Sequence, residues 1–130
     1  MQLNQITMPA SDIEMSLAWY LVLGFKLIVS SPDYKRLQAP AGEATLSLSC
    51  DDAPVTGPTP KIYLECASVT ELDEQVTALQ AKGVQFQSLP TDQNWLWREA
   101  WTADPSGNPV CLYFSGGNRL HPPWQVKNNH

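Results

Sequence analysis

Apolar and polar residues alternate in short runs along the chain, and in two longer runs the apolar residues recur at helical spacing instead. In the run 13–21 apolar side chains lie three or four positions apart, and Gly24 follows it. The run 69–79 has the same spacing and is followed by Gly83. Such spacing predicts an amphipathic helix, and a glycine just beyond it favours the left-handed residue that ends many helices. The sequence therefore predicts two helices.

Each predicted helix is preceded by a capping box, a serine followed three residues later by a glutamate. Ser11 and Glu14 form the first box, and Ser68 and Glu71 form the second. In this motif the hydroxyl accepts a hydrogen bond from a first-turn backbone N–H, and the glutamate bonds back toward the cap. We expect the helices to begin directly after these two serines.

Short alternating runs on both sides of each helix predict strands. One run precedes each helix, and three follow it before the next break. The first set comprises 3–8, 25–30, 34–38 and 44–49, and the second comprises 61–66, 84–87 and the two arms of a hairpin, 95–102 and 109–114. Both halves of the chain therefore have the order βαβββ, which is an internal repeat of about sixty residues.

The repeat predicts the domain organisation and the fold class. We expect a first βαβββ module over 1–50, a proline-containing linker over 51–60, a second module over 61–115 and an extended C-terminal tail over 116–130. Each module alone would leave one sheet face and one helix stripe exposed, so the two must pair. The predicted fold is α+β, a curved mixed-sheet trough with helices on its outer faces. Its concave side is the default binding site.

The hairpin carries most of the indole rings. In a strand over 95–102, the side chains of Trp95, Trp97, Glu99 and Trp101 would share one face, because successive side chains alternate. The residues Asp104 to Asn108 (Asp-Pro-Ser-Gly-Asn) supply the turn that reverses the chain. An indole-rich face can be a ligand-binding wall, or it can simply pack on a core. Both interpretations stay open at this point.

Composition excludes several classes of function. The net charge is -5 with only eight Lys and Arg residues and no basic cluster, so nucleic acid is not an expected partner. The N-terminus lacks the features of a signal peptide, and no apolar run approaches the ~20 residues of a membrane span, so we expect a cytoplasmic protein with no membrane partner. Three cysteines without CxxC spacing predict reduced thiols.

Several motifs together resemble the vicinal oxygen chelate superfamily, which includes glyoxalase I, bleomycin-resistance proteins, fosfomycin-resistance enzymes and extradiol dioxygenases. These motifs are the segment Pro9 to Asp12 before the first helix, Leu-Gly-Phe at 23–25, Ala-Lys-Gly-Val at 81–84 and the hairpin 97–108. The resemblance extends to about Phe114. The hairpin is most similar to that of the bleomycin-resistance branch.

The resemblance also implies where a metal would bind. Enzymes of this superfamily hold a divalent ion with His or Gln on the first strand of each half and usually Glu on the last. The matching positions here are Gln5, Lys61, Ser47 and Cys111, and only Gln5 has a usual ligand type. The Lys61 ammonium has no lone pair and repels a cation. We therefore predict no metal, no other cofactor and no catalytic residue.

The histidines do not change this prediction. His121 and His130 are the only two, and both follow the repeat. Two prolines after His121 predict an extended path with a surface histidine. The chain also has no nucleophile-elbow motif, phosphate-binding loop or HExxH motif.

The leading hypothesis is a metal-independent binder of a small aromatic or cationic molecule, similar to bleomycin-resistance proteins. We expect a homodimer in which the segment 118–124 helps to cover a pocket. Glu99 either selects a positive charge or pairs with Lys61, and Cys111 is expected to be a small inward hydrophobe. The predicted ligand-binding residues are Gln5, Ser47, Lys61, Tyr63, Trp95, Trp97, Glu99, Trp101, Cys111 and Tyr113.

Two other functions are compatible with the same residues. The protein could be a metal-dependent lyase or dioxygenase of the superfamily, with its metal bound through a different strand register. It could also be a partner-binding module that uses the aromatic face as a peptide groove.

Overall fold

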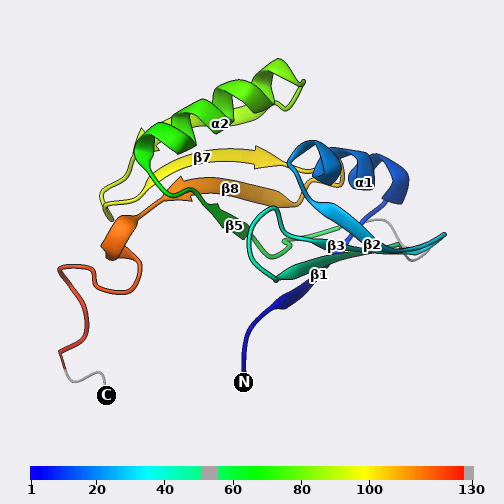
Figure 1. Cartoon of the computed structure of the whole chain (residues 1–130), viewed down its shortest axis with the longest axis horizontal. Coiled ribbons are helices and arrows are strands. Elements are labelled where there is room, and N and C mark those ends of the chain that lie inside the picture. The colour runs from blue at the N-terminus through cyan, green and yellow to red at the C-terminus, as the bar shows by residue number, and fades with distance from the viewer. Residues whose placement is uncertain (51–55, 128–130) are drawn as a thin grey trace. The chain divides into compact units, whose positions relative to one another are not determined.

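The computed structural model describes residues 1–50 and 56–127, and its elements follow the predicted order (Figure 1). The first half contains β1 (Gln5–Pro9), α1 (Ile13–Val22), β2 (Lys26–Ser31), β3 (Tyr34–Gln38) and β4 (Thr45–Ser49). The second half contains β5 (Ile62–Glu65), α2 (Val69–Ala81), β6 (Phe86–Asp92), β7 (Arg98–Ala103), β8 (Pro109–Phe114) and the 3₁₀ turn η1 (Gly116–Asn118). The α+β class with two βαβββ repeats is confirmed.

The strands form two four-stranded mixed sheets with matching topology. The strand orders are β1-β4-β3-β2 and β5-β8-β7-β6. In each sheet the first strand of the repeat pairs in parallel with the last, so Gln5 lies beside Thr45 and Tyr63 lies beside Cys111. This pairing brings the start and the end of each module together.

The chain divides into two compact units. Unit 1 contains Met1–Lys61 together with Ala103–Pro109, and unit 2 contains Ile62–Thr102 together with Val110–His130. The turn of the β7–β8 hairpin therefore belongs to unit 1. Of the predicted linker, residues 51–55 lie outside the described residues, as do residues 128–130 of the predicted tail, including His130.

In unit 1, α1 packs on one face of its sheet. Ile13, Leu17 and Tyr20 are buried on the helix, and Met8, Leu37, Leu46 and Leu48 are buried on the strands. The buried leucines of β3 and β4 alternate with polar neighbours, as expected for strands with a single buried face. Among the described residues, the apolar core of unit 1 therefore lies on the side of the sheet that faces α1.

The capping box predicted at Ser11 is wrong. Asp12 is the N-cap, and its carboxylate accepts a hydrogen bond of 3.0 Å from the Met15 backbone N–H. The Ser11 backbone N–H instead donates to the Ser106 hydroxyl at 3.0 Å, and Glu14 pairs with Lys35 at 3.0 Å. Aspartate caps as well as serine does, so a tertiary contact of Ser11 decides between two adjacent candidates.

Of the second capping box, the serine cap is confirmed, and the glutamate bonds one residue before the cap. The Ser68 hydroxyl accepts a hydrogen bond of 3.0 Å from the Glu71 backbone N–H, and the Glu71 carboxylate accepts one from the Ala67 N–H. Helix α2 buries Leu72, Val76 and Leu79, and it runs along one face of the sheet of unit 2 (Figure 1). An ion pair between Arg98 and Asp73, 3.0 Å long, joins β7 to this helix.

The buried Asp104 carboxylate organises the hairpin turn of unit 1. One oxygen accepts hydrogen bonds of 2.9 Å from the backbone N–H groups of Ser106 and Asn108. The other accepts bonds of 2.7 Å from the Tyr20 hydroxyl and from the Asn108 side-chain amide, which also donates to the Pro9 carbonyl. Burial raises the pKa of Tyr20, and the charge of Asp104 raises it further, so the phenol remains a donor.

We expect Asp104→Asn to lower the free energy of unfolding by about 2 kcal/mol, because its new NH₂ group would face another donor, the Asn108 amide. Tyr20→Phe deletes a single donor and should cost about 1 kcal/mol. Urea unfolding followed by circular dichroism measures both changes. Asp33→Asn, at an exposed turn residue, is the matched control and should change stability by less than about 0.5 kcal/mol. Equal effects of the two Asp→Asn variants would contradict this role of Asp104.

Candidate functional site

The face of the unit 2 sheet that α2 does not cover carries aromatic side chains. Arg98 reaches α2, so strand alternation places Glu99 and Trp101 on the opposite face of β7. Four rings contact one another there, and we call them the ring cluster. They are Tyr63 of β5, Trp97 immediately before β7, Trp101 of β7 and Tyr113 of β8.

The ring cluster combines one stacked pair with three edge-on contacts. Trp97 stacks on Tyr113 with 4.6 Å between ring centroids and 17° between ring planes. Tyr63 meets Trp97, Trp101 and Tyr113 edge-on, at centroid distances of 5.9, 5.5 and 5.7 Å. Each such pair contributes about 0.5–1.5 kcal/mol beyond its buried area. Tyr63 nevertheless remains 44% exposed, so the cluster reaches the surface of the sheet.

Glu99 fixes the orientation of two indoles. Its side chain is buried, with 4% exposure. One carboxylate oxygen accepts a hydrogen bond of 2.6 Å from the Trp95 indole N–H, and the other accepts one of 2.9 Å from the Trp101 indole N–H. A carboxylate has about four lone-pair sites, so the two indole donors leave acceptor capacity on each oxygen.

The predicted strand over 95–102 begins three residues late. Residues 93–96 form a turn with Asn94 and Trp95 at its centre, closed by a hydrogen bond of 3.0 Å from the Leu96 N–H to the Gln93 carbonyl, and Leu96 has φ of 68°. A left-handed leucine interrupts strand alternation, so alternation does not place Trp95. The Glu99 carboxylate brings Trp95 to the site instead, and 47% of Trp95 stays exposed.

Cys111 lies on β8 beside Tyr63 and is completely buried. Burial raises the pKa of the Cys111 thiol to about 12, and the nearby charge of Glu99 also raises it. The group is therefore a neutral thiol at physiological pH. Burial also raises the pKa of Cys66, to about 11.

In unit 1, the sheet face opposite α1 is polar. Two of the predicted site residues meet there, since the Gln5 amide donates to the buried Ser47 hydroxyl at 2.9 Å. Sequence reasoning missed two others, Tyr34 and Arg36. The Tyr34 phenol lies 2.6 Å from the Ser47 oxygen and accepts a hydrogen bond of 3.1 Å from Arg36 Nε. Alternation along the predicted strand 34–38 would have placed Tyr34 and Arg36 on one face, and the pairing of Arg36 with Ser47 puts Ser47 on that face too.

Lys61 and His121, which the sequence analysis also considered, are both exposed. Lys61 is exposed at the end of the Met1–Lys61 segment of unit 1. In the tail, His121 is also exposed, and its backbone N–H donates to the Gly117 carbonyl at 2.8 Å. This hydrogen bond closes a turn over residues 117–121. The prediction of an extended path around His121 is therefore wrong.

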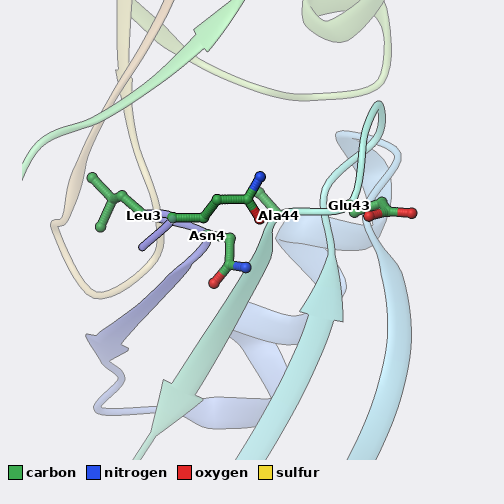
Figure 2. A pocket seen from close by; sticks show the side chains of 5 residues that line it. Leu3, Asn4, Glu43 and Ala44 are labelled. Carbon is green, nitrogen blue, oxygen red and sulfur yellow. The ribbon is translucent and has the colours of Figure 1, made fainter.

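A surface hollow of about 380 Å³ lies elsewhere on unit 1, beside the start of β1. Its lining residues are all exposed, and Figure 2 shows Leu3 and Glu43 pointing away from each other. It is lined by Gln2, Leu3, Asn4, Glu43 and Ala44. A specific small-molecule site needs polar groups that converge on the ligand, and this hollow lacks that arrangement.

The family model of the glyoxalase/bleomycin resistance protein/dioxygenase superfamily matches residues 2–112, so the chain belongs to this superfamily. Over 97% of its length it is similar to 89% of a crystal structure of such a protein from Nocardioides, at a TM-score of 0.79 and 22% identity. It is also similar to a lactoylglutathione lyase from Agrobacterium tumefaciens, at a TM-score of 0.76 and 18% identity, with 92% of this chain and 96% of that one covered.

A third similar structure is TioX from Micromonospora sp. ML1, with a TM-score of 0.68 and 16% identity over 88% of this chain and 99% of that one. Identities this low show the shared fold and leave the activity open. The comparison with curated proteins gives no match. No helix in residues 1–50 or 56–127 is long and apolar enough to cross a membrane.

The residues at the metal-binding positions of the superfamily do not fit a divalent ion. The Gln5 carbonyl oxygen already accepts a hydrogen bond from the Thr45 hydroxyl, Ser47 and Lys61 carry no carboxylate or imidazole, and Cys111 is a protonated thiol. Within the described ranges, no three His, Cys, Asp or Glu side chains are grouped closely enough to hold a metal.

We expect Cys111 to react with a disulfide reagent such as DTNB at least a hundredfold more slowly than free cysteine at pH 8, because the rate depends on the thiolate. Mass spectrometry of the labelled protein identifies the site that reacts. In urea all three thiols should react quickly, which provides the control. Rapid labelling of Cys111 in the folded protein would show that its thiol ionises easily and would reopen its use as a soft-metal ligand.

Proposed function

We propose that this protein binds a small, flat, aromatic or cationic molecule without a metal ion, in the manner of a bleomycin-resistance protein, and that it does so in the cytoplasm. The observation that carries the proposal is the ring cluster together with the buried Glu99 carboxylate. Stacking on indoles holds flat groups, and ring faces attract cations, with about 0.5–2 kcal/mol for each contact.

The exposure of the rings favours binding over packing. Aromatic residues that serve only a core are expected to be covered, but Tyr63 and Trp95 expose nearly half of their surface beside a buried carboxylate. The Trp97–Tyr113 stack supports Tyr63, which contacts both of its rings edge-on. Rigid rings lose little conformational entropy on binding, so such a surface suits a small ligand.

The family resemblance assigns further residues to ligand binding, and we propose them for each unit separately. Cys111 contributes a small, neutral wall next to Tyr63. Gln5 and Ser47 form a hydrogen-bonded pair in unit 1, and Lys61 is assigned by its position before β5. We propose that the protein is a homodimer, as bleomycin-resistance proteins usually are. Sedimentation equilibrium measures this directly.

Two roles for Glu99 follow from its chemistry. A carboxylate with remaining lone pairs can select a cationic ligand. Alternatively, Glu99 pairs with the Lys61 ammonium, and the pair then orients the site without selecting charge. The two roles predict opposite responses to ligand charge, so they can be separated by experiment.

We expect Trp97→Leu to weaken binding of quinoline and N-methylquinolinium by roughly tenfold or more, because the stacked surface is lost. Shifts of the indole N–H signals in ¹⁵N NMR spectra give the affinities. Trp19→Leu removes an indole of α1 in unit 1, where it contacts Tyr20, and is the matched control, which should leave both affinities unchanged. Circular dichroism checks that each variant folds.

Three outcomes would overturn the proposal. If neither probe shifts the signals of Trp95, Trp97 and Trp101, the ring cluster serves packing only. A bound peptide from a partner protein, displaced by neither probe, would indicate a peptide groove. Stoichiometric Ni, Zn, Mn or Fe, lost to EDTA together with turnover, would indicate a metal-dependent lyase or dioxygenase.

Ligand charge separates the two roles of Glu99. If Glu99 selects charge, the wild type should prefer N-methylquinolinium over neutral quinoline by several-fold, and Glu99→Gln should remove that preference. If Glu99 pairs with Lys61, the wild type should show no preference, and Lys61→Gln should create one. An absence of charge preference in all three proteins would exclude Glu99 from contact with the ligand.

A further inference from the structure

A chain of hydrogen bonds crosses three strands on the polar face of unit 1. It runs from Gln5 on β1 through Ser47 on β4 to Tyr34 and Arg36 on β3. The Arg36 guanidinium carbon also lies 5.5 Å from the centroid of the Tyr34 ring. These four side chains, which we call the donor chain, form a polar cluster that the ring cluster of unit 2 does not include.

The direction of each hydrogen bond can be derived, beginning with Gln5. Its amide nitrogen lies 3.0 Å from the Ile6 carbonyl oxygen, which can only accept, so this end of the amide is the NH₂ group. That group therefore donates to Ser47. The buried Ser47 hydroxyl must then place its own hydrogen, and its remaining partner is the Tyr34 oxygen at 2.6 Å.

Tyr34 consequently accepts two hydrogen bonds, one from Ser47 and one from Arg36. Both lone pairs of the phenol oxygen are occupied, so its hydroxyl hydrogen is directed away from these partners. Arg36 uses its Nε–H on Tyr34, which leaves the two terminal NH₂ groups of the guanidinium. No carboxylate in residues 1–50 or 56–127 lies within ion-pair distance of Arg36. The exposed end of the donor chain therefore presents donors only.

We propose that the Tyr34–Arg36 end of the donor chain binds the carboxylate group of a small molecule. The planar NH₂ groups of a guanidinium match the two oxygens of a carboxylate, and the phenol can add a third hydrogen bond. Arg36 supplies one positive charge, which balances a carboxylate but not a doubly charged phosphate. This inference concerns unit 1 alone and does not depend on ligand binding by the ring cluster.

The pKa of Tyr34 gives the site a distinct pH dependence. Hydrogen bonds from Ser47 and then from Arg36 lower the pKa of Tyr34 below its usual value. Arg36 is the charged group that faces this phenol, while Gln5, Ser47 and the cross-strand neighbours Ser31 and Ser49 are uncharged. Above its pKa the phenol becomes an anion and loses the hydrogen that it would donate. Carboxylate binding should therefore be lost as pH rises through the pKa of Tyr34.

The test uses the full chain with sodium benzoate and, separately, inorganic phosphate as probes. We expect benzoate to shift the Arg36 Nε–H signal in ¹⁵N NMR spectra, and to bind at least several-fold more tightly than phosphate at pH 7. Arg36→Gln should weaken benzoate binding by roughly tenfold or more. Lys26→Gln, which removes an exposed cation from the neighbouring strand β2, is the matched control and should have no effect.

Tyr34→Phe is the second test variant in the benzoate experiment. It should weaken benzoate binding several-fold at pH 7 and abolish the loss of affinity at high pH, while the wild type keeps that loss. Equal weakening by Arg36→Gln and Lys26→Gln would show nonspecific charge attraction and overturn the proposal. A pH profile unchanged in Tyr34→Phe would remove Tyr34 from the site. If benzoate binds but Trp97→Leu leaves its affinity unchanged, the donor chain acts independently of the ring cluster.

Discussion

A β-strand can bury only one of its two faces against a helix, and this constraint determines where chemistry is possible in the molecule. In each unit one sheet face packs on a helix and holds the apolar core. The other face carries the residues at alternate positions. In unit 2 that face holds four rings and a buried carboxylate, and in unit 1 it holds an amide, a hydroxyl, a phenol and a guanidinium. The same topology thus presents two surfaces of different chemistry.

Hydrophobic spacing was sufficient to predict the order of the elements, because helix and strand periods are local properties of the sequence. The predicted start or end of an element was wrong where tertiary contacts decided between neighbouring residues. Ser11 bonds to the turn at Ser106, which leaves Asp12 as the cap. The strand predicted over 84–87 is instead Phe86–Asp92, and β7 begins only at Arg98 because Leu96 adopts a left-handed conformation. Nothing in a leucine signals that conformation beforehand.

Parts of the candidate sites could be predicted for the same reason. Alternation along the hairpin placed Glu99 and Trp101 on one face, and the family resemblance gave Gln5 and Ser47 as two separate positions, which a hydrogen bond joins. The hydrogen bonds that organise these residues could not be predicted, since they depend on which strands become neighbours. Arg36 shows the difference. As a charged residue on a strand it resembled a solvated side chain, and only its bond to Tyr34 gives it a defined geometry.

The hairpin turn of residues 103–109 also has a consequence for synthesis of the protein. Unit 1 includes this turn, which supplies Asp104 to the Tyr20 hydroxyl and the Asn108 amide to the Pro9 carbonyl. Those partners are separated by 84 and 99 residues along the chain. A nascent chain that has exposed only its first half therefore lacks the carboxylate on which α1 is anchored. During synthesis, unit 1 therefore cannot complete its native contacts until residues 103–109 of the second module have been made.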